Sequence, residues 1–361
     1  MSDPTGIRTL VPGLKRPCPS PLDDGAPSNG APNRVRLGGA ANLFYHLFDS
    51  GATISLTMNS PEIMQLIPEK GSVPLASLYI DSPYHHLHEL SRKKDGPVVI
   101  SNFVVSANGI IAVEDTNGNS HPPDEILNSS DWQVFQNVNF HADVIITGGD
   151  YLTRFSKGGT QNVLTQFEEG GDFEGLGLKR LAMNLPRSPA VAVVSRSLKF
   201  EIPKVLLDEG RQIIIFTTDK MAGSEAAKAF GELPNVTVVP VGDENGEGVD
   251  GKKMVDELYQ MGHKVIKMTT GPQVLEILLK AKVLDRLYLT RVRREVPVKK
   301  YVSVTRLFPE GQSAEDLAGF TLSERYLQQN VETKDGETAS QEFLVFDSND
   351  FLSSIKSPTS V

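Results

Sequence analysis

Short apolar runs alternate with amphipathic stretches along residues 97–290, and this alternation is the main structural signal of the sequence. The first run, residues 98–105, is rich in β-branched side chains and too short to span a membrane, so it predicts a buried strand. Further strands are predicted at 110–113, 143–147, 190–194, 212–216, 236–239, 264–267 and 286–290, and helices at 129–138, 176–183, 224–230, 252–261 and 272–281. Short strands that alternate with helices predict an α/β fold with a mostly parallel central sheet flanked by helices.

The segments on either side of this alternation have other patterns. Residues 1–36 are rich in proline and glycine, which predicts a disordered leader. Residues 37–94 predict an N-terminal extension that packs on the core, with a helix beginning at Pro61, a strand at 74–80 and a short helix at 84–92. Antiparallel strands are expected at 322–328 and 342–346. The main domain is therefore expected at 95–347, followed by a flexible tail at 348–361.

The composition limits the classes of function. A net charge of −9 and a pI near 5.4 argue against general binding to nucleic acid or anionic membranes. Cys18 is the only cysteine, which excludes a disulfide framework and a thiolate metal site and favours a reducing, cytoplasmic location. The sequence has no apolar run long enough for a membrane helix and no signal-peptide pattern.

Several familiar motifs are incomplete. His85, His86 and His88 lie close together but no second ligand cluster accompanies them, so a solvated helix without metal is expected. Residues 246–253, GEGVDGKK, have the spacing of a phosphate-binding loop. However, Lys253 stands where a serine or threonine must reach magnesium, and the acidic neighbours would repel phosphates. A dinucleotide-binding Gly-x-Gly-x-x-Gly fingerprint that opens a βα unit is absent.

Three polar stretches follow predicted strands and are candidates to line one cleft. The first is the turn Ser106-Ala107-Asn108-Gly109. The second, Ser195-Arg196-Ser197, offers a guanidinium fork and two hydroxyl groups, which suit a phosphate monoester. The third, Thr269-Thr270-Gly271-Pro272, precedes a helix whose first amide groups can bind an anion. Ordinary surface loops remain the alternative for each stretch when it is taken alone.

Four blocks in order carry a resemblance to a known family: VVISNFVVSANGIIAV, HADVIITGGDYL, SPAVAVVSRSLKF and KVIKMTTGPQVLEILLKAKVLDRLYLT. Together they resemble the C-terminal reductase domain of bacterial RibD, the pyrimidine reductase of riboflavin biosynthesis, which has a dihydrofolate-reductase-like fold. The likeness spans about residues 97–290. It implies an NADPH-dependent reductase that transfers hydride to the ribosyl carbon of a phosphorylated pyrimidine or a related small molecule. It also implies a homodimer.

The resemblance assigns roles to individual residues of this sequence. The residues expected near the nicotinamide and the substrate, and therefore the catalytic candidates, are Asn102, Ser106 and Asn108. The residues expected to bind the cofactor are Gly148, Gly149, Tyr151, Ser195, Arg196, Ser197, Thr270, Gly271 and Pro272. Ser195, Arg196 and Ser197 would hold the phosphate that distinguishes NADPH from NADH, and Thr270 to Pro272 would receive the pyrophosphate.

The sequence departs from the family pattern at three positions. Asn108 and Thr269 replace acidic residues of the family, and Asn139 replaces an arginine. A second hypothesis is therefore a catalytically degenerate member that binds a nucleotide and acts as a binding or regulatory protein. A third is an interaction protein with only general α/β similarity. A basic cleft around Arg196 on an otherwise acidic protein would favour the reductase over an interaction protein.

Overall fold

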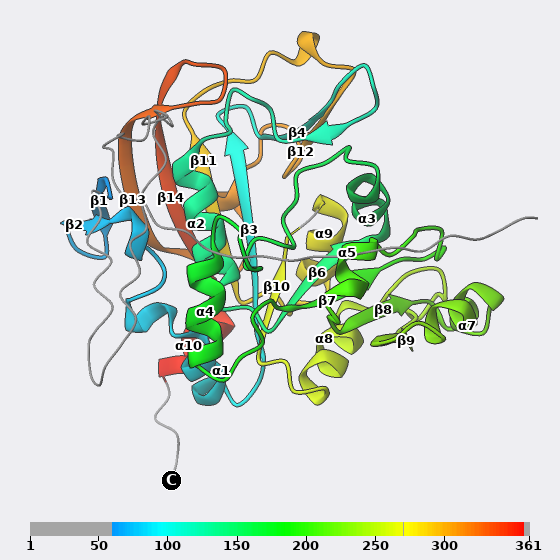
Figure 1. Ribbon diagram of the computed structural model, residues 1–361. Coiled ribbons are helices and arrows are strands. Elements are labelled where there is room, and N and C mark those ends of the chain that lie inside the picture. Colours follow the sequence, from blue (N-terminus) through cyan, green and yellow to red (C-terminus); the bar gives the residue numbers. More distant parts are fainter. Residues whose placement is uncertain (1–59, 270, 357–361) are drawn as a thin grey trace, which may run out of the picture. The chain divides into compact units, whose positions relative to one another are not determined.

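The computed structural model describes residues 60–269 and 271–356. Eleven strands form one twisted sheet in the order β2-β1-β13-β14-β11-β3-β10-β6-β7-β8-β9 (Figure 1). The seven strands from β11 onward run parallel: β11 (Arg286–Val292), β3 (Val98–Ser106), β10 (Val265–Met268), β6 (Val144–Gly148), β7 (Ala190–Val194), β8 (Ile213–Thr217) and β9 (Val236–Pro240). This arrangement confirms the predicted fold class and the predicted alternation.

The remaining strands of the large sheet are antiparallel: β2 (Gly71–Pro74), β1 (Glu62–Ile67), β13 (Phe320–Glu332) and β14 (Thr338–Ser348). The long hairpin of β13 and β14 confirms the predicted antiparallel strands near the C-terminus, and it pairs with β11. A separate small sheet contains β12 (Ser303–Arg306), β4 (Ile110–Glu114) and β5 (Ser120–His121).

Helices cover both faces of the large sheet because its central strands are apolar on both sides. One face carries α1 (Leu87–Lys94), α2 (Ser129–Asn139), α3 (Gly149–Ser156), α5 (Lys204–Asp208), α7 (Glu225–Gly231) and α10 (Asn349–Lys356). The other carries α8 (Gly251–Gln260) and α9 (Pro272–Lys280). The remaining helices are α4 (Glu174–Ala182), α6 (Asp219–Ala222), η1 (Leu75–Ser77), η2 (Pro83–His85), η3 (Val298–Lys300) and η4 (Ala314–Asp316).

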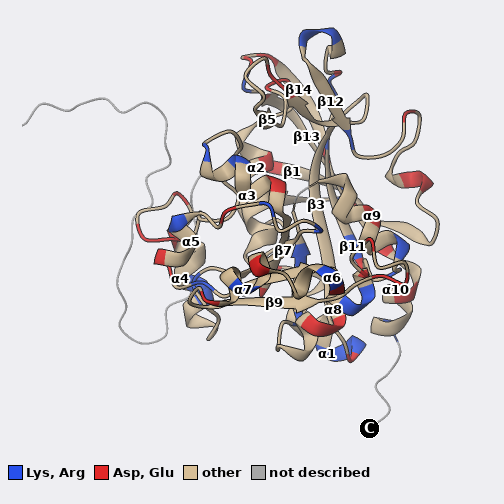
Figure 2. Ribbon diagram, turned by 90° about the vertical axis from the view of Figure 1, so that its right-hand side faces the viewer, with Lys and Arg blue, Asp and Glu red and all other residues tan. Residues whose placement is uncertain are grey.

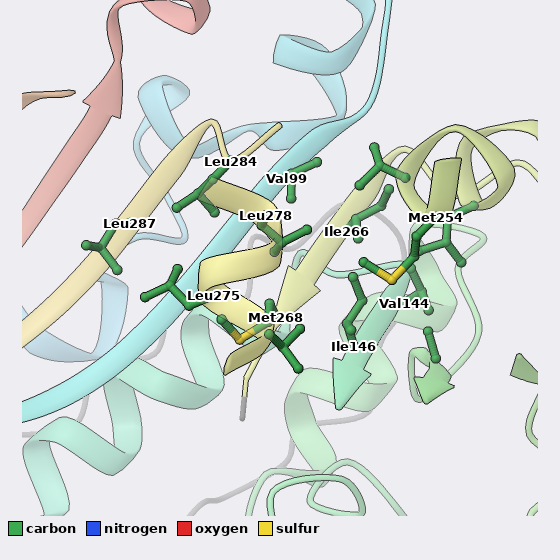
Figure 3. Packing of buried hydrophobic residues seen from close by; sticks show 14 of the residues in the cluster. Val99, Val144, Ile146, Met254, Ile266, Met268, Leu275, Leu278, Leu284 and Leu287 are labelled. Atoms are coloured by element: carbon green, nitrogen blue, oxygen red, sulfur yellow. The ribbon is translucent and has the colours of Figure 1, made fainter. Parts of the chain in front are cut away.

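Alternate residues of β3 and β10 separate the two cores. Val98 and Val265 pack with α1, α2 and α10, whereas Val99 and Ile266 face α8 and α9. Figure 3 shows this second core, in which Leu275 and Leu278 of α9 and Met254 of α8 lie against side chains of β3, β6 and β10. The period of two along each strand therefore determines which helix each residue contacts.

Residues 60–94 are built differently from the prediction. The helix expected from Pro61 is wrong, because this segment forms β1, which pairs with β13 and buries Ile63. The strand expected at 74–80 is also wrong, because only Pro74 is in a strand and η1 follows it. Strands β1 and β2 of this segment therefore belong to the large sheet. The leader expected at 1–36 lies outside the described residues.

The histidine-bearing segment is anchored in the core by the buried side chain of His85, whereas the sequence predicts a solvated helix. His85 is fully buried, with its Nε2 atom 2.9 Å from Oε2 of Glu324 and its Nδ1 atom 3.0 Å from the hydroxyl of Tyr288. Beside it, the buried guanidinium of Arg286 donates to Asp347 over 2.6 Å. Each charged group in this cluster has a partner, as burial requires.

The C-terminal segment is a packed helix, so the flexible tail predicted at 348–361 is wrong as far as residue 356. Helix α10 buries Phe351 completely, in the same core as Leu87 and Leu90 of α1. Four of its eight residues are exposed and polar or charged, so the sequence alone did not indicate that Phe351 is buried.

We expect Phe351→Ala to reduce the free energy of unfolding by about 3–5 kcal/mol, because it removes a fully buried ring and leaves a cavity. Urea unfolding monitored by circular dichroism measures the loss. Ser353→Ala, at an exposed position of the same helix, is the control and should change stability little. Equal stability of Phe351→Ala and the unmodified protein would contradict the packing of α10.

Acid should destabilise the fold through His141. This histidine is buried, its Nε2 atom lies 2.6 Å from the carbonyl oxygen of Tyr79, and burial lowers its pKa to about 3. The native state therefore resists protonation between the ordinary pKa of about 6.5 and this value, and stability is lost as pH falls through that window.

We expect His141→Gln to flatten this loss by up to about 1.4 kcal/mol per pH unit, measured by urea unfolding at a series of pH values. The exposed His86→Gln is the matched control and should leave the slope unchanged. An identical acid slope in His141→Gln and the unmodified protein would show that His141 does not titrate in this way.

Candidate active site

The parallel strands end at different heights along one edge of the sheet. Met268, the last residue of β10, lies level with Ser101 of β3 and with Ile146 of β6. Strand β3 continues to Ser106, paired with β11 throughout. Because the carboxyl ends of parallel strands lie at one edge, the ends of β10, β6 and β7 form a step beside the projecting part of β3 and β11.

The predicted cofactor-binding residues that the structure describes gather at this step. Gly148 ends β6 and Gly149 begins α3. Ser195, Arg196 and Ser197 directly follow β7, the neighbour of β6. Gly271 precedes α9, with Pro272 as its first residue, after β10. Thr270 lies outside the described residues. The strands that these three stretches follow are neighbours in the order β10, β6, β7.

Close packing holds the turn between β6 and α3 against the residues after β7. A Cβ atom on Gly149 would lie 2.9 Å from the ring of Phe200 and 3.3 Å from Oγ of Ser195, so only glycine fits without movement. Oγ of Ser195 accepts a hydrogen bond from the amide of Leu198 over 3.0 Å, which fixes the loop. Gly271 has a φ of +69°, and no side chain caps the start of α9.

Arg196 is exposed at this step. It makes no hydrogen bond or ion pair with any residue in the described part of the chain, in contrast to the buried arginines of the core. Lys199 adds a second exposed cation to the same loop, and Glu201 follows it. Elsewhere, basic and acidic residues are interspersed along the chain (Figure 2). An exposed guanidinium beside two serines remains available to an anionic ligand.

Tyr151 supports the site from within α3. Its hydroxyl donates to the carbonyl oxygen of Gln161 over 2.9 Å and accepts from the amide of Val163 over 3.0 Å. Burial raises its pKa, so the phenol stays neutral. Tyr151 therefore ties α3 to the loop that follows it, and the structure gives this residue a supporting contact beside its predicted contact with a cofactor.

Ser106 and Asn108 are both engaged within the turn that ends β3. Oδ1 of Asn108 accepts from the hydroxyl of Ser106 at 2.7 Å and from the amide of Val296 at 3.1 Å, and its Nδ2 donates to the carbonyl oxygen of Val296. Oγ of Ser106 accepts from the amide of Ile110. Their catalytic role stays a prediction, while these contacts give them a structural one.

A buried polar cluster lies where α2 crosses the step; we call it the α2 cluster, and it consists of Asn102, Asp131, Thr269 and Thr290. Asn102 and Thr269 were candidates from the sequence, whereas sequence reasoning missed Asp131 and Thr290. All four are at most 9% exposed. The buried hydroxyl of Thr269 has no hydrogen-bond partner among the described residues. Such an unpartnered buried group is typical of a site that receives polar atoms of a ligand.

Asp131 is the carboxyl of this cluster. Burial raises its pKa to about 6, although a hydrogen bond from Thr290 and the positive charge of Lys267 act in the opposite direction. A carboxyl group with this pKa exchanges its proton near neutral pH, a property of general acids and bases. Asp131 was not recognised from the sequence because residues 129–131 have the polar pattern of an ordinary helix start.

Lys267 lies below the α2 cluster on β10. Its ammonium group donates to Oδ1 of Asn139 over 2.5 Å and lies 3.7 Å from the centre of the Phe135 ring. Asn139 stands at the position for which the resemblance implied an arginine. On α2, Val134 and Val138 are buried, whereas Trp132 and Phe135 are half-buried.

A pocket of about 790 Å³ opens beside the first turn of α2. Trp132 forms part of its wall, stacked on Phe135 at a centroid distance of 5.4 Å, and Asn128, the N-cap of α2, forms another part. His121 and Lys334 lie on the far walls. Neither Arg196 nor Gly271 lines it, and none of the four residues of the α2 cluster does, so the pocket is separate from the predicted cofactor-binding residues.

The family assignment follows from the comparison with family models. Residues 97–292 match the RibD C-terminal domain, which is more than half of the chain. The chain belongs to the RibD C-terminal domain family. The match covers β3 through β11 and therefore contains all of the predicted site residues. No protein of curated function matches this sequence.

Solved structures agree with this fold. A pyrimidine reductase-like protein from Corynebacterium diphtheriae is 19% identical, with a TM-score of 0.51 over 76% of this chain and 99% of that one. The Thermotoga maritima deaminase/reductase is 14% identical, with a TM-score of 0.45 over 71% of this chain and 57% of that one. The Saccharomyces cerevisiae reductase Rib7 is 14% identical, with a TM-score of 0.43 over 70% of this chain and 90% of that one. At 19% identity the first likeness shows a shared fold.

Two classes of feature are not found in this RibD-family chain as far as it is described. No three histidine, cysteine, aspartate or glutamate side chains lie together as metal ligands in residues 60–269 and 271–356. None of the helices in those ranges is long and apolar enough to cross a membrane.

We expect Asn108→Ala to lower the free energy of unfolding by roughly 1–3 kcal/mol, because the main-chain groups of Val296 lose both side-chain partners. Chemical denaturation measures this loss, with the exposed neighbour substitution Ala107→Ser as the control. If Asn108 has no structural role, the two variants will be equally stable.

Proposed function

We propose that the chain is an NADPH-dependent reductase that acts on a phosphorylated pyrimidine, such as 5-amino-6-(5-phosphoribosylamino)uracil, or on a related small molecule. Membership of the RibD C-terminal domain family supports the class of reaction. The observation that carries the proposal is the exposed, unpaired guanidinium of Arg196 between two serines at the end of β7, beside the close-packed start of α3. A cytoplasmic homodimer is part of the same proposal.

The residues at the step suit a nicotinamide dinucleotide phosphate. Arg196, Ser195 and Ser197 would hold the terminal phosphate by charge-assisted hydrogen bonds. The uncapped amide groups at the start of α9, after Gly271, would receive the pyrophosphate, and Gly149 lets the backbone of α3 come close. When bound, NADPH would supply the hydride, and the chain would supply alignment, charge and a site with little water.

The α2 cluster suits the pyrimidine. Asn102 offers an amide donor and acceptor, Thr269 a hydroxyl, and Asp131 a carboxyl group, which together match a heterocycle with neighbouring N–H and C=O groups. In the proposed reaction, hydride adds to the carbon of the opened ribosyl C=N group, and a proton adds to its nitrogen. The product is a ribitylamino compound. Asp131 is the group proposed to deliver that proton.

One observation favours the second hypothesis, a nucleotide-binding member without turnover. The polar atoms of Asn108 are occupied by Ser106 and Val296, so this residue does not replace the carboxylate that the family pattern has there. The α2 cluster still contains the carboxyl group of Asp131, which supports the reductase. Substrate reduction separates the two hypotheses.

A titration with NADPH and NADH, followed by the fluorescence of the reduced nicotinamide, tests the cofactor site. We expect NADPH to bind more tightly, and Arg196→Ala to narrow the difference by roughly 1–3 kcal/mol, because a charge-assisted hydrogen bond to phosphate is lost. Arg92→Ala, at an exposed arginine of α1, is the matched control and should leave both affinities unchanged. If neither NADPH nor NADH binds, the proposed reductase function is rejected.

A further inference from the structure

Three buried amide side chains lie between the β13–β14 hairpin and the start of α2. We call them the amide chain, and it consists of Asn128, Gln328 and Gln341. Gln341 of β14 is fully buried, and Gln328 stands directly opposite it on β13. Buried amides cost free energy unless their donors and acceptors are paired, so the bonds that these three residues form define their arrangement.

Gln341 is the centre of the amide chain. Its Nε2 atom donates to Oε1 of Gln328 over 2.9 Å and to Oδ1 of Asn128 over 3.3 Å. Its Oε1 atom accepts from Nδ2 of Asn128 over 2.8 Å. Both N–H groups and the carbonyl oxygen of the side chain are thus used. A carboxylate at this position would lack both donors, and an aliphatic side chain would lack all three bonds.

Both ends of the amide chain reach α2 beside Asp131. Asn128 is the N-cap, and its Oδ1 atom accepts from the main-chain amide of Asp131 over 2.8 Å. At the other end, Nε2 of Gln328 donates to Oγ of Ser130 over 2.9 Å. The carboxyl group of Asp131 has its own hydrogen bond from Thr290 of β11. Three neighbouring strands, β13, β14 and β11, therefore each hold one residue at the start of α2.

The rest of α2 is anchored independently of the amide chain. Nδ2 of Asn137 donates to the carbonyl oxygen of Leu78 over 2.9 Å, and Val134 and Val138 are buried in the core that α1 and α10 share. Helices fray from their ends, and a lost N-cap leaves the first amide groups without partners. Loss of the amide chain should therefore loosen the first turn, which carries Asp131, and leave the body of the helix in place.

We propose that Gln341 and Gln328 are positioning residues for Asp131: they fix the first turn of α2 to the β13–β14 hairpin and thereby hold the Asp131 carboxyl group where it delivers its proton. This inference rests on the proposed function, because Asp131 meets a substrate only in the reductase. Neither glutamine is a catalytic residue, since one acts through Asn128 and the other through Ser130.

Crystal structures of the full chain, unmodified and with Gln341→Met, test the anchoring. We expect residues 129–132 to move by about 1 Å or more, because the cap loses the bonds that orient it, while residues 134–139 stay in place. Gln329→Met, at an exposed position of β13, is the matched control and should leave the first turn unmoved. An unmoved Asp131 carboxyl group in Gln341→Met would overturn the inference.

The rate of a single turnover with NADPH and the proposed substrate shows whether Gln341 acts through Asp131. We expect Gln341→Met to lower this rate by about tenfold to a hundredfold, with the affinity for NADPH unchanged. In Asp131→Asn, the same substitution should lower the remaining rate less than about twofold, because no proton-delivering carboxyl group is left to position. Equal fold losses in the two backgrounds would overturn the inference, since a merely structural glutamine affects both alike.

Gln328→Met takes the place of Gln341→Met in both experiments if the latter does not fold. It breaks the bond to Ser130 and leaves the pair of Gln341 and Asn128 intact, and the same outcomes decide. The crystal structures need no turnover, so a displaced first turn in a protein without reductase activity rejects the proposed function alone. Substrate reduction by a protein in which neither substitution affects Asp131 rejects this inference alone.

Discussion

The staggered ends of the parallel strands are the constraint on which the site depends. Strand β10 ends at Met268, level with Ser101, whereas β3 and β11 continue together to Ser106 and Val292. Because β10 is shorter than its neighbour β3, a step forms between these two strands. Helix α2 crosses this step on one face of the sheet. Polar groups can be buried at this step because the ladder of main-chain hydrogen bonds has ended on one side. The position of the α2 cluster and the neighbouring turns after β6, β7 and β10 all follow from this stagger.

The buried polar groups on the α2 side of the sheet differ in whether they have hydrogen-bond or ion-pair partners. Toward β13 and β14, each charge has a close partner, as in the contacts of Arg286 with Asp347 and of His85 with Glu324. At the step, the hydroxyl of Thr269 lacks a partner among the described residues, and the ammonium of Lys267 contacts the amide oxygen of Asn139 rather than a carboxylate. The first arrangement stabilises a native fold, and the second is expected where a ligand completes the contacts. The contrast within one core locates the site better than any single residue does.

The sequence could predict the parts of this molecule that depend on local periodicity. The strands from β3 to β11 and the turns that follow them have a regular pattern of apolar and small polar residues. Strand β1 and helix α10 were missed because their burial depends on partners far away in the chain, β13 and α1, and not on a period of their own. Asp131 was missed for a related reason, since its raised pKa comes from burial in the folded protein, at a helix start that looks ordinary in the sequence.

Reduction of a phosphorylated pyrimidine tests the central claim most directly. The measurement is a single turnover with 5-amino-6-(5-phosphoribosylamino)uracil and NADPH that carries deuterium at the transferable position of the nicotinamide, followed by mass spectrometry of the product. The account predicts a ribitylamino product with one deuterium on its former ribosyl carbon, formed by the unmodified protein and much more slowly by Asp131→Asn. Recovery of unlabelled, unreduced substrate from a protein that binds NADPH would contradict it, and would leave a nucleotide-binding protein without turnover.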